Sequence, residues 1–378
     1  MKPIVRAERM KPVHSDIRGP LFVEAMKRQK QGIDILKLNT GNPATFGFGL
    51  PDSIKNALME HMQDGVGYCD FKGMPQARQA ICDYETSKGI KGITPDDVFI
   101  GNGVSEVVSF ALTPLLNDGD EVLVPSPSYS LWGNSVYLED GKPVFYTCDE
   151  QANWYPDIQD IRSKITDKTK AIVIINPNNP TGVLYPKELL LEIIQIARES
   201  GLLIFADEIY DRLVMDGKQH ISLASLTEDV PVITLNGLSK SHCLCGYRCG
   251  WMVISGPREL TEDYRQGIIQ LTSLRLCANT MAQIVIPAAL DDMETPASMV
   301  RPGGRIYEQR EATVRELEKI DGLSFVKNDA AFYVFPKLDV KKFNITNDKQ
   351  FAHDLLDATN ILLVPGSGFD WKDPDHFR

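Results

Sequence analysis

Short runs of apolar residues recur through the middle of the chain, and polar stretches separate them. Continuous apolar runs of a few residues are typical of strands that are covered on both faces of a parallel sheet. Six such runs occur, at residues 98–100, 121–125, 171–176, 202–208, 232–237 and 251–255.

Helical patterns lie between several of these runs. Residues 105–116 follow the first run, and residues 186–201 precede the fourth. The second segment has Pro186 near its start and Gly201 at its end, positions where these residues favour a helix start and stop. Strands that alternate with helices predict an α/β fold with crossover connections.

The pattern changes after about residue 290. Residues 305–320 have the pattern of a long charged helix, residues 322–338 suggest two strands of a hairpin, and residues 361–369 suggest a strand and a loop. This layout predicts a smaller α+β domain beside the large α/β domain. We expect an N-terminal arm that joins part of the small domain at 1–45, the large domain at 46–292, and the small C-terminal domain at 293–378.

Composition and charge narrow the class of protein. The chain has 378 residues, 43% of them apolar, which is enough for about two domains with proper cores. Its formal net charge of −11 argues against nucleic-acid binding, which normally uses a basic face. The amino terminus has no apolar run, and no stretch approaches the ~18 apolar residues of a membrane span. The seven irregularly spaced cysteines predict free thiols in a reducing cytoplasm.

Polar motifs directly follow five of the apolar runs. In an open parallel sheet, ligands bind beyond the carboxyl ends of the strands, so these motifs should converge at one rim. They are GNGVSE, SPSYS, NPNNPTG, DEIY and SKSHCLCGYR.

Each motif also has a simpler interpretation. GNG before a helix suits an anion site, but short Gly-x-Gly is common by chance. NPNNPTG can be a turn, Asp207 can cap a helix that starts at Glu208, and Lys240 can lie on the surface. These interpretations do not explain why the motifs occur together at successive strand ends.

One chemistry uses the whole set. A lysine amine forms a Schiff base with an aldehyde cofactor, and a pyridine cofactor needs a carboxylate at its ring nitrogen. Such a cofactor also needs donors to its phenolate oxygen, an aromatic face and a phosphate cradle. The residues that fill these roles in turn are Lys240, Asp207, Tyr210 with Asn179, Tyr129, and Gly103, Val104 and Ser105 with Arg248. The sequence therefore predicts a pyridoxal 5′-phosphate site.

The chain resembles the class I/II aminotransferases of the fold-type I pyridoxal-phosphate enzymes over essentially its whole length. GLSKSHCLCGYRCG looks like the family's lysine signature, and NPNNPTG and ADEIY follow the family's order and spacing. DIRGP, LNTGNPA, GYCD, LRLCAN and RPGGRIYEQR are most similar to the bacterial alanine aminotransferase subgroup. The resemblance implies a large domain with a mostly parallel, seven-stranded type of sheet covered by helices.

The resemblance also implies a role for each cofactor residue. Lys240 would bind the cofactor covalently and then serve as the base for proton transfer, and Asp207 would pair with the pyridine nitrogen. Tyr210 and Asn179 would bind the phenolate oxygen, and Tyr129 would stack on the ring. The phosphate would be held by Gly103, Val104, Ser105, Ser239 and Arg248.

Substrate and subunit contacts follow from the same resemblance. Tyr68 would reach the phosphate of the other subunit, which implies a homodimer. Arg378 would bind the substrate α-carboxylate with its bidentate fork, helped by Asn179 and the backbone of Gly41. Arg18, on the N-terminal arm, would bind a side-chain carboxylate or close the pocket over a small substrate.

The sequence departs from the family pattern at several positions. Cys243 and Cys249 replace small or aliphatic residues, and Gly237 stands where many members have a serine, so Ser239 would supply that hydroxyl. The family usually continues with a further strand and helix beyond the position of Arg378. We therefore expect an incomplete small domain with Arg378 on a fraying terminus.

Two further expectations concern the prolines and the cysteines. The resemblance implies cis peptide bonds at Ser126–Pro127 and Asn179–Pro180. Cys243, Cys245 and Cys249 lack the paired C-x₂-C spacing of a structural zinc site, so we expect no metal there and small apolar fillers near the lysine.

The sequence leaves the substrate more open than the reaction. By its likeness to the subgroup, the chain would exchange the amino group between L-alanine and 2-oxoglutarate, with amino acids and 2-oxo acids as its small-molecule partners. Arg275 could instead hold the distal carboxylate of aspartate, or it could be a surface arginine. The alternatives are an aminotransferase for aspartate, aromatic or branched amino acids, a lyase or decarboxylase of the same fold, and a non-catalytic ligand-sensing domain.

Overall fold

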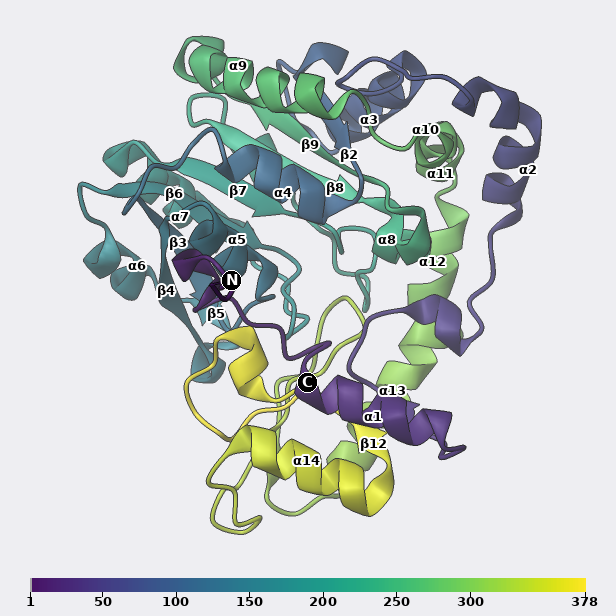
Figure 1. The fold of residues 1–378 in the computed structure, drawn as a ribbon, viewed down its shortest axis with the longest axis vertical. Helices are drawn as coiled ribbons and strands as arrows, with labels where there is room; N and C mark the ends of the chain where they lie inside the picture. The colour runs from purple at the N-terminus through teal and green to yellow at the C-terminus, as the bar shows by residue number, and fades with distance from the viewer. Residues whose placement is uncertain (1) are drawn as a thin grey trace.

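An eight-stranded sheet forms the centre of the molecule, which the computed structural model describes from residue 2 to residue 378 (Figure 1). Across the sheet, its strands are β2 (Val98–Gly101), β9 (Gly250–Ser255), β8 (Val232–Gly237), β7 (Leu203–Asp207), β6 (Thr169–Ile175), β3 (Glu121–Ser126), β4 (Lys142–Asp149) and β5 (Tyr155–Pro156). Strands β4, β3, β6, β7 and β8 run parallel to one another, and β9, β2 and β5 are antiparallel to their neighbours. The predicted α/β fold with a mostly parallel sheet is confirmed.

All six apolar runs of the sequence form strands of this sheet. Strand β4 was not among them because its residues alternate between buried and exposed, so it has no continuous apolar run. Strand β5 has only two residues and pairs with the end of β4 at the sheet edge. The remaining seven strands, of four to eight residues, correspond to the seven-stranded type.

Helices cover both faces of the sheet, which explains why its strands are apolar throughout. On β6, Ile172 and Ile174 join a core cluster on one face, while Val173 and Ile175 join a cluster on the other. The first cluster includes α6 (Ile158–Lys164) and α7 (Lys187–Ser200), and the second includes α4 (Val104–Leu112), α5 (Leu131–Leu138) and α9 (Arg258–Arg275). The third cluster, beside β2 and β9, includes α2 (Asp52–His61), α3 (Pro75–Ser87), α10 (Thr280–Ile284) and α11 (Ile286–Asp291).

The two predicted helices next to the sheet are both present, but α4 ends at Leu112, two residues before Pro114, rather than at residue 116. Helix α7 begins directly after Pro186 and ends at Gly201, which has a φ of 66°. Helix α4 begins directly after Gly103, which has a φ of 86° and lies two residues beyond the end of β2. The polar motif after β2 therefore forms a helix amino terminus, as the sequence predicts.

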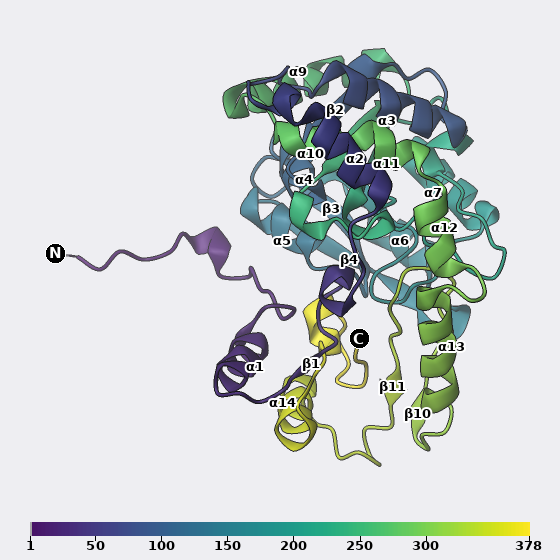
Figure 2. The ribbon, with the colours of Figure 1, turned by 90° about the vertical axis from the view of Figure 1, so that its right-hand side faces the viewer.

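The N-terminal and C-terminal segments associate below the sheet (Figures 1 and 2). Strand β1 (Leu36–Lys37) pairs in parallel with β12 (Ile361–Leu362), and α1 (Pro20–Lys30) lies beside α14 (Asp348–Thr359). The predicted charged helix is α13 (Arg305–Leu317), which follows α12 (Glu294–Val300). The predicted hairpin is reduced to β10 (Leu323–Ser324) and β11 (Lys337–Leu338), which are antiparallel.

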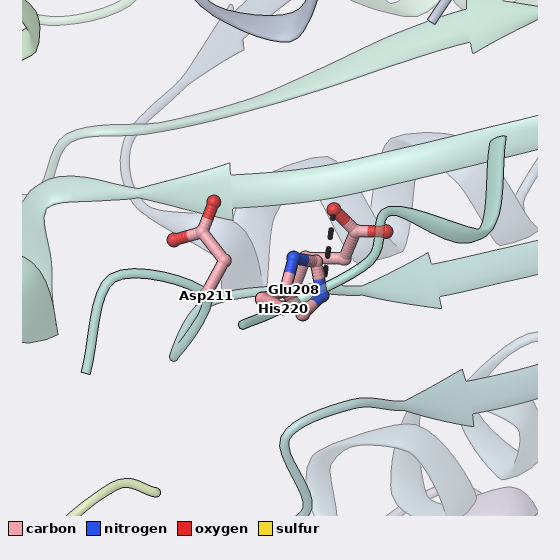
Figure 3. Close-up of side chains that lie close together, drawn as sticks. All are labelled: Glu208, Asp211 and His220. Carbon is pink, nitrogen blue, oxygen red and sulfur yellow. Dashed lines mark ion pairs between the residues drawn. The ribbon is translucent and has the colours of Figure 1, made fainter. Parts of the chain in front are cut away.

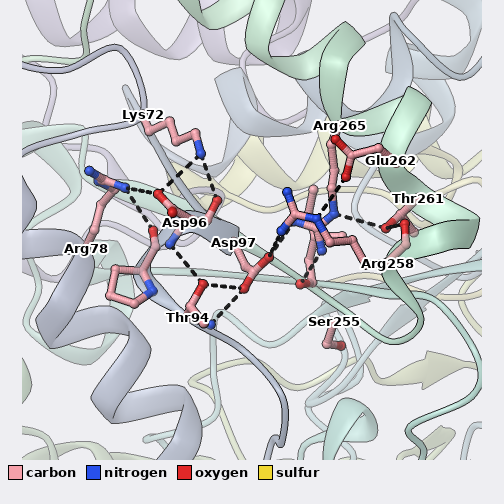
Figure 4. Close-up of polar contacts among 12 residues, drawn as sticks. Lys72, Arg78, Thr94, Asp96, Asp97, Ser255, Arg258, Thr261, Glu262 and Arg265 are labelled. Carbon is pink, nitrogen blue, oxygen red and sulfur yellow. Dashed lines mark hydrogen bonds and ion pairs between the residues drawn. The ribbon is translucent and has the colours of Figure 1, made fainter.

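A buried ion pair attaches α9 to the turn that precedes β2 (Figure 4). Asp97 ends the short 3₁₀ helix Pro95–Asp97, and its carboxylate accepts from the backbone of Thr94 at 2.7 Å. The other carboxylate oxygen lies 2.6 Å from Nη1 of Arg265, and both side chains are almost fully buried. The pair fixes the start of β2, whose far end carries the α4 motif.

One of the two predicted cis peptide bonds is at a different position in the structure. The bond Ser126–Pro127 is cis, but the second cis bond is Asn176–Pro177 rather than Asn179–Pro180. Residues 176–180 contain two Asn–Pro pairs, and the sequence pattern does not distinguish between them.

No single helix within residues 2–378 is both long enough and apolar enough to span a membrane. One pair, α9 with the α10–α11 segment, meets both requirements together but is bent by 120°.

Candidate active site

A cavity of about 180 Å³ lies beyond the carboxyl ends of β6, β7 and β8. It brings together residues from the N-terminal segment, from the sheet and from the end of the chain. The predicted residues on its wall are Gly41, Val104, Ser105, Tyr129, Asn179, Asp207, Tyr210, Ser239, Lys240, Arg248 and Arg378. The motifs that follow successive strands therefore converge, as the sheet argument predicts.

Lys240 lies on α8 (Leu238–Ser241), the short helix that directly follows β8. Its Nζ donates to the carbonyl oxygen of Gly41 at 3.0 Å. Before the helix, Gly237 has no room for a side chain, because a Cβ there would lie 2.6 Å from the carbonyl oxygen of Cys249. Close packing between β8 and β9 thus explains why this chain has glycine at a position where many members of the resembled family have a serine.

Asp207 ends β7 and is buried in the wall of the cavity. Its Oδ2 accepts from the indole Nε1 of Trp132 at 3.0 Å, and its Oδ1 accepts from the backbone of Ile209 at 3.4 Å. Burial raises the pKa of Asp207 to about 6, and the indole hydrogen bond works in the opposite direction. The site therefore holds a carboxylate that lacks a cationic partner close enough to offset its loss of solvation.

Sequence reasoning missed Trp132. It lies three residues after Tyr129, at the start of α5, and three residues are close to one helical turn. That spacing was the available signal: a residue one turn beyond a cavity tyrosine can reach the same wall.

The amino terminus of α4 and Arg248 form a positively charged end of the cavity. A Cβ at Gly103 would overlap the Arg248 guanidinium, and a Cβ at Gly250 would overlap the backbone nitrogen of Val104. Two glycines thus allow Arg248 to lie against the helix start, where Ser105 supplies a hydroxyl. Helix amino termini present free N–H groups and a positive dipole end, so this arrangement suits an anion such as a phosphate.

Arg378 is buried rather than frayed, so the expectation of a disordered end is wrong. Its Nη1 donates to Oδ1 of Asn179 at 3.0 Å, and its Nη2 donates to the carbonyl oxygen of Asn39 at 2.5 Å. Its backbone nitrogen bonds the carbonyl oxygen of Val364 at 2.9 Å, which fixes the main chain. Among the interactions of residues 2–378, its buried Nε has no acceptor.

Tyr210 and Tyr333 meet at the cavity wall. Their hydroxyl oxygens are 2.9 Å apart, and burial raises the pKa of Tyr210 well above its usual value. Sequence reasoning missed Tyr333 because its segment was assigned to a hairpin strand, whereas residues 325–336 contain no regular strand. The segment is instead held by long-range bonds, such as that from the backbone nitrogen of Ala331 to the carbonyl oxygen of Leu213.

Several predicted residues lie outside the cavity. Gly103 lies behind Arg248, Tyr68 is 83% exposed, and Arg18 is exposed while its neighbour Ile17 lines the cavity. The side chain of Arg275 is occupied by an ion pair of 2.6 Å with Glu106 and by two backbone carbonyls. This arrangement favours a structural role for Arg275.

The three cysteines after Lys240 are packed individually. Cys243 and Cys249 are buried, and burial raises the pKa of each thiol to about 12. Cys245 lines the cavity, and its Sγ lies 3.0 Å from the carbonyl oxygen of Ser239. Buried thiols as hard to ionise as those of Cys243 and Cys249 suit the predicted role of small fillers.

A buried ionic cluster supports the turn that carries Asp207 and Tyr210. Glu208 and Asp211, which belong to this turn, lie close to His220 (Figure 3). Their ligand atoms have the spacing of a metal site, but Nζ of Lys88 lies 2.7 Å from Oε2 of Glu208 and 3.1 Å from Oδ2 of Asp211. The lysine ammonium therefore supplies the positive charge that these carboxylates need.

The fold and the cavity together define a fold-type I aminotransferase site, and comparison with known proteins agrees. Residues 33–378 match the model of the family "Aminotransferase class I and II". The chain belongs to this family, which implies dependence on pyridoxal 5′-phosphate.

Relatives whose names state an activity align with the whole chain. Over 378 residues, the chain is 50% identical to the glutamate-pyruvate aminotransferase AlaA of Haemophilus influenzae and covers 94% of that protein. Over the same length it is 44% identical to the alanine aminotransferase of Mycobacterium tuberculosis and covers 88% of that protein. Among solved structures, an aminotransferase from Escherichia coli has a TM-score of 0.98 at 48% identity, covering 100% of this chain and 93% of that one. An alanine aminotransferase from Pyrococcus furiosus has a TM-score of 0.93 at 41% identity, covering 99% and 94%.

Proposed function

We propose that the chain transfers an amino group between L-alanine and 2-oxoglutarate, with pyruvate and L-glutamate as the products, and that it uses pyridoxal 5′-phosphate. The relatives named above support the choice of alanine, since the two curated ones carry this activity in their names. The observation that carries the proposal is the single cavity in which Lys240, Asp207 and Arg378 meet.

The residues present fit the cofactor at both of its ends. Asp207 is a buried carboxylate with a raised pKa, and a protonated pyridine nitrogen would supply the missing positive charge. At the other end, Ser105, Arg248 and the start of α4 would hold the phosphate. Tyr129 would lie against the ring, and Tyr210 and Asn179 would bind the phenolate oxygen.

The cofactor, when bound, supplies an electron sink for the pair of electrons left at the substrate Cα. Lys240 would first hold the aldehyde covalently and then, once displaced by substrate, take the Cα proton on its Nζ and pass it to the carbon that had carried the aldehyde oxygen. Its position, with Nζ 3.0 Å from the Gly41 carbonyl, keeps the amine at the cavity wall rather than in solvent.

Arg378 would bind the substrate carboxylate. Its guanidinium keeps a buried Nε without an acceptor among residues 2–378, although its other nitrogens contact Asn179 and Asn39. A guanidinium has five N–H donors in a fork that matches a carboxylate, and Arg378 lines the cavity while its bonds to Asn179 and Asn39 use only one donor of each Nη. A substrate carboxylate bound by Arg378 and Asn179 would orient the substrate so that its Cα hydrogen faces Lys240.

We further propose a homodimer in which Tyr68 reaches the phosphate of the partner's cofactor. Tyr68 is 83% exposed, and Met62 and Val66 beside it are 53% and 76% exposed. Such a group of exposed apolar side chains is typical of a surface that a partner covers.

The absorption spectrum of the purified protein tests the proposed function. We expect a visible band from the bound cofactor, its loss in Lys240→Ala, and its retention in Lys91→Ala, a matched control on an exposed lysine. Excess L-alanine should convert the wild-type band into that of the amine form of the cofactor and release pyruvate. An unchanged band in Lys240→Ala would reject Lys240 as the anchor, and a lack of conversion by alanine would favour a lyase or another amino-acid substrate.

A further inference from the structure

Tyr333 occupies the boundary between the active-site cavity and a second, larger cavity. The second cavity has a volume of about 450 Å³, is lined mainly by apolar side chains, and shares Thr40, Gly41 and Tyr333 with the first. It contains neither Lys240 nor Asp207. Tyr333 therefore belongs to the wall of the reactive site, although no sequence motif indicated it.

The position of the Tyr333 side chain is fixed on several sides. Its hydroxyl is so close to Gly41 that a Cβ on that glycine would overlap it. The Arg378 guanidinium lies 4.3 Å from the centre of its ring, and the Phe332 ring lies 4.9 Å away at a steep angle. A ring held in this way keeps its hydroxyl directed at the Tyr210 hydroxyl, 2.9 Å away.

We propose that Tyr333 is a positioning residue, whose hydroxyl donates to Tyr210 and thereby directs the Tyr210 proton toward the cofactor phenolate oxygen. The inference rests on the proposed function. In the structure described here, Tyr210 donates to Tyr333. A phenol has one proton to donate, so Tyr210 can donate into the cavity only if the bond between the two hydroxyls reverses.

This reversal has a chemical consequence for Tyr210. A hydroxyl that accepts one hydrogen bond is a stronger donor in the next, because hydrogen bonds in a chain polarise one another. The charged groups that face the pair are Arg378, Asp207 and Lys240, and none of them changes when the Tyr333 hydroxyl alone is removed. Tyr333→Phe therefore isolates the contribution of that hydroxyl while it keeps the ring beside Arg378.

The test is a pH titration of the visible band of the cofactor-loaded enzyme. A hydrogen bond to the phenolate oxygen stabilises its negative charge, so losing the bond raises the midpoint pH at which the band changes. We expect Tyr333→Phe to raise this midpoint by on the order of 0.5 pH units, and Tyr210→Phe to raise it further. In the double variant, removal of the Tyr333 hydroxyl should add nothing, because its only route to the cofactor has been removed.

Tyr185→Phe is the matched control, because Tyr185 is a buried tyrosine whose hydroxyl faces Cys148 and lies outside the cavity. The midpoint pH of the visible band in Tyr185→Phe should equal that of wild type. A midpoint in Tyr333→Phe equal to wild type, or a shift that persists in the Tyr210→Phe background, would overturn the proposed relay.

Steady-state kinetics provide an independent readout. Because Tyr333→Phe keeps the ring against Arg378, the KM for L-alanine should stay within about twofold of wild type while kcat falls. Tyr333→Leu, which removes the ring, should raise KM as well. A rise in KM with unchanged kcat in Tyr333→Phe would contradict the inference. If wild type itself lacks a titrating band, the proposed function fails, which is distinct from failure of the relay.

Discussion

Replacing Asp207 by asparagine should stabilise the cofactor-free protein at neutral pH, even though it should abolish efficient catalysis. The pKa of Asp207 is raised from 3.8 to about 6, chiefly by burial. Well below pH 3.8 the carboxyl is neutral in the folded and unfolded chains, so it carries no penalty there. Between about pH 4 and pH 6 the unfolded chain is ionised while the folded chain keeps its proton, so the free energy of unfolding falls across this range and levels off above it.

The size of the effect follows from the difference in pKa. A difference of roughly two units corresponds to about 3 kcal/mol, present in full above pH 6 and absent below about pH 4. Asparagine has nearly the same shape, and its carbonyl oxygen can still accept from Trp132 Nε1. We therefore expect Asp207→Asn to gain about 1–3 kcal/mol at pH 7.5 and close to nothing at pH 4.

Urea denaturation of the cofactor-free protein, at one protein concentration and several pH values, measures this difference. Asp229→Asn is a control of opposite sign, because the Arg198 guanidinium beside Asp229 holds the pKa of that carboxyl well below its usual range. That variant should be no more stable than wild type at pH 7.5. A constant difference between Asp207→Asn and wild type from pH 4 to pH 7.5, or a less stable variant at pH 7.5, would refute the reasoning.

Two other changes test the scaffold and the substrate arginine. Arg265→Met leaves the buried Asp97 carboxylate without its partner, so the free energy of unfolding measured in urea should fall by about 3 kcal/mol. Arg258→Met is the control at an exposed arginine and should have little effect. If Arg265→Met and Arg258→Met lost the same free energy of unfolding, the cost assigned to leaving the Asp97 carboxylate buried without a partner would be contradicted. Arg378→Ala should raise the KM of every amino-acid substrate by about tenfold or more, since each presents the same α-carboxylate. A rise confined to acidic substrates in initial-rate assays would show that Arg378 binds side chains instead.

Much of the sheet and of the site follows from local sequence. Strands buried on both faces have continuous apolar runs, so the positions that follow them could be identified without a structure. Asp207 ends β7 and Lys240 lies just after β8, and parallel neighbours end at the same rim. Strand β4 was missed for the converse reason, because it is partly exposed and its pattern alternates.

Residues that reach the site through long-range contacts could not be predicted in the same way. Trp132 contacts Asp207 across 75 positions of sequence, and Tyr333 contacts Tyr210 across 123. Neither partner can be inferred from strand or helix periodicity, which specifies the face of an element but not the element opposite. The same holds for Arg378, whose burial depends on contacts with a segment more than 330 residues earlier in the chain.

That early segment also determines how the reactive groups are placed. The carbonyl of Asn39 accepts from Arg378, and the carbonyl of Gly41 accepts from Lys240, so residues 39–41 bridge the proposed carboxylate and amine groups. The same segment lies beside β1, which pairs with β12 below the sheet. Because β12 and Arg378 both belong to the C-terminal part of the chain, a shift of that part would move Arg378 and residues 39–41 together relative to Lys240, which follows β8 of the large sheet. The distance between the proposed carboxylate site and Lys240 therefore depends on β1–β12 pairing as well as on the sheet that holds the lysine.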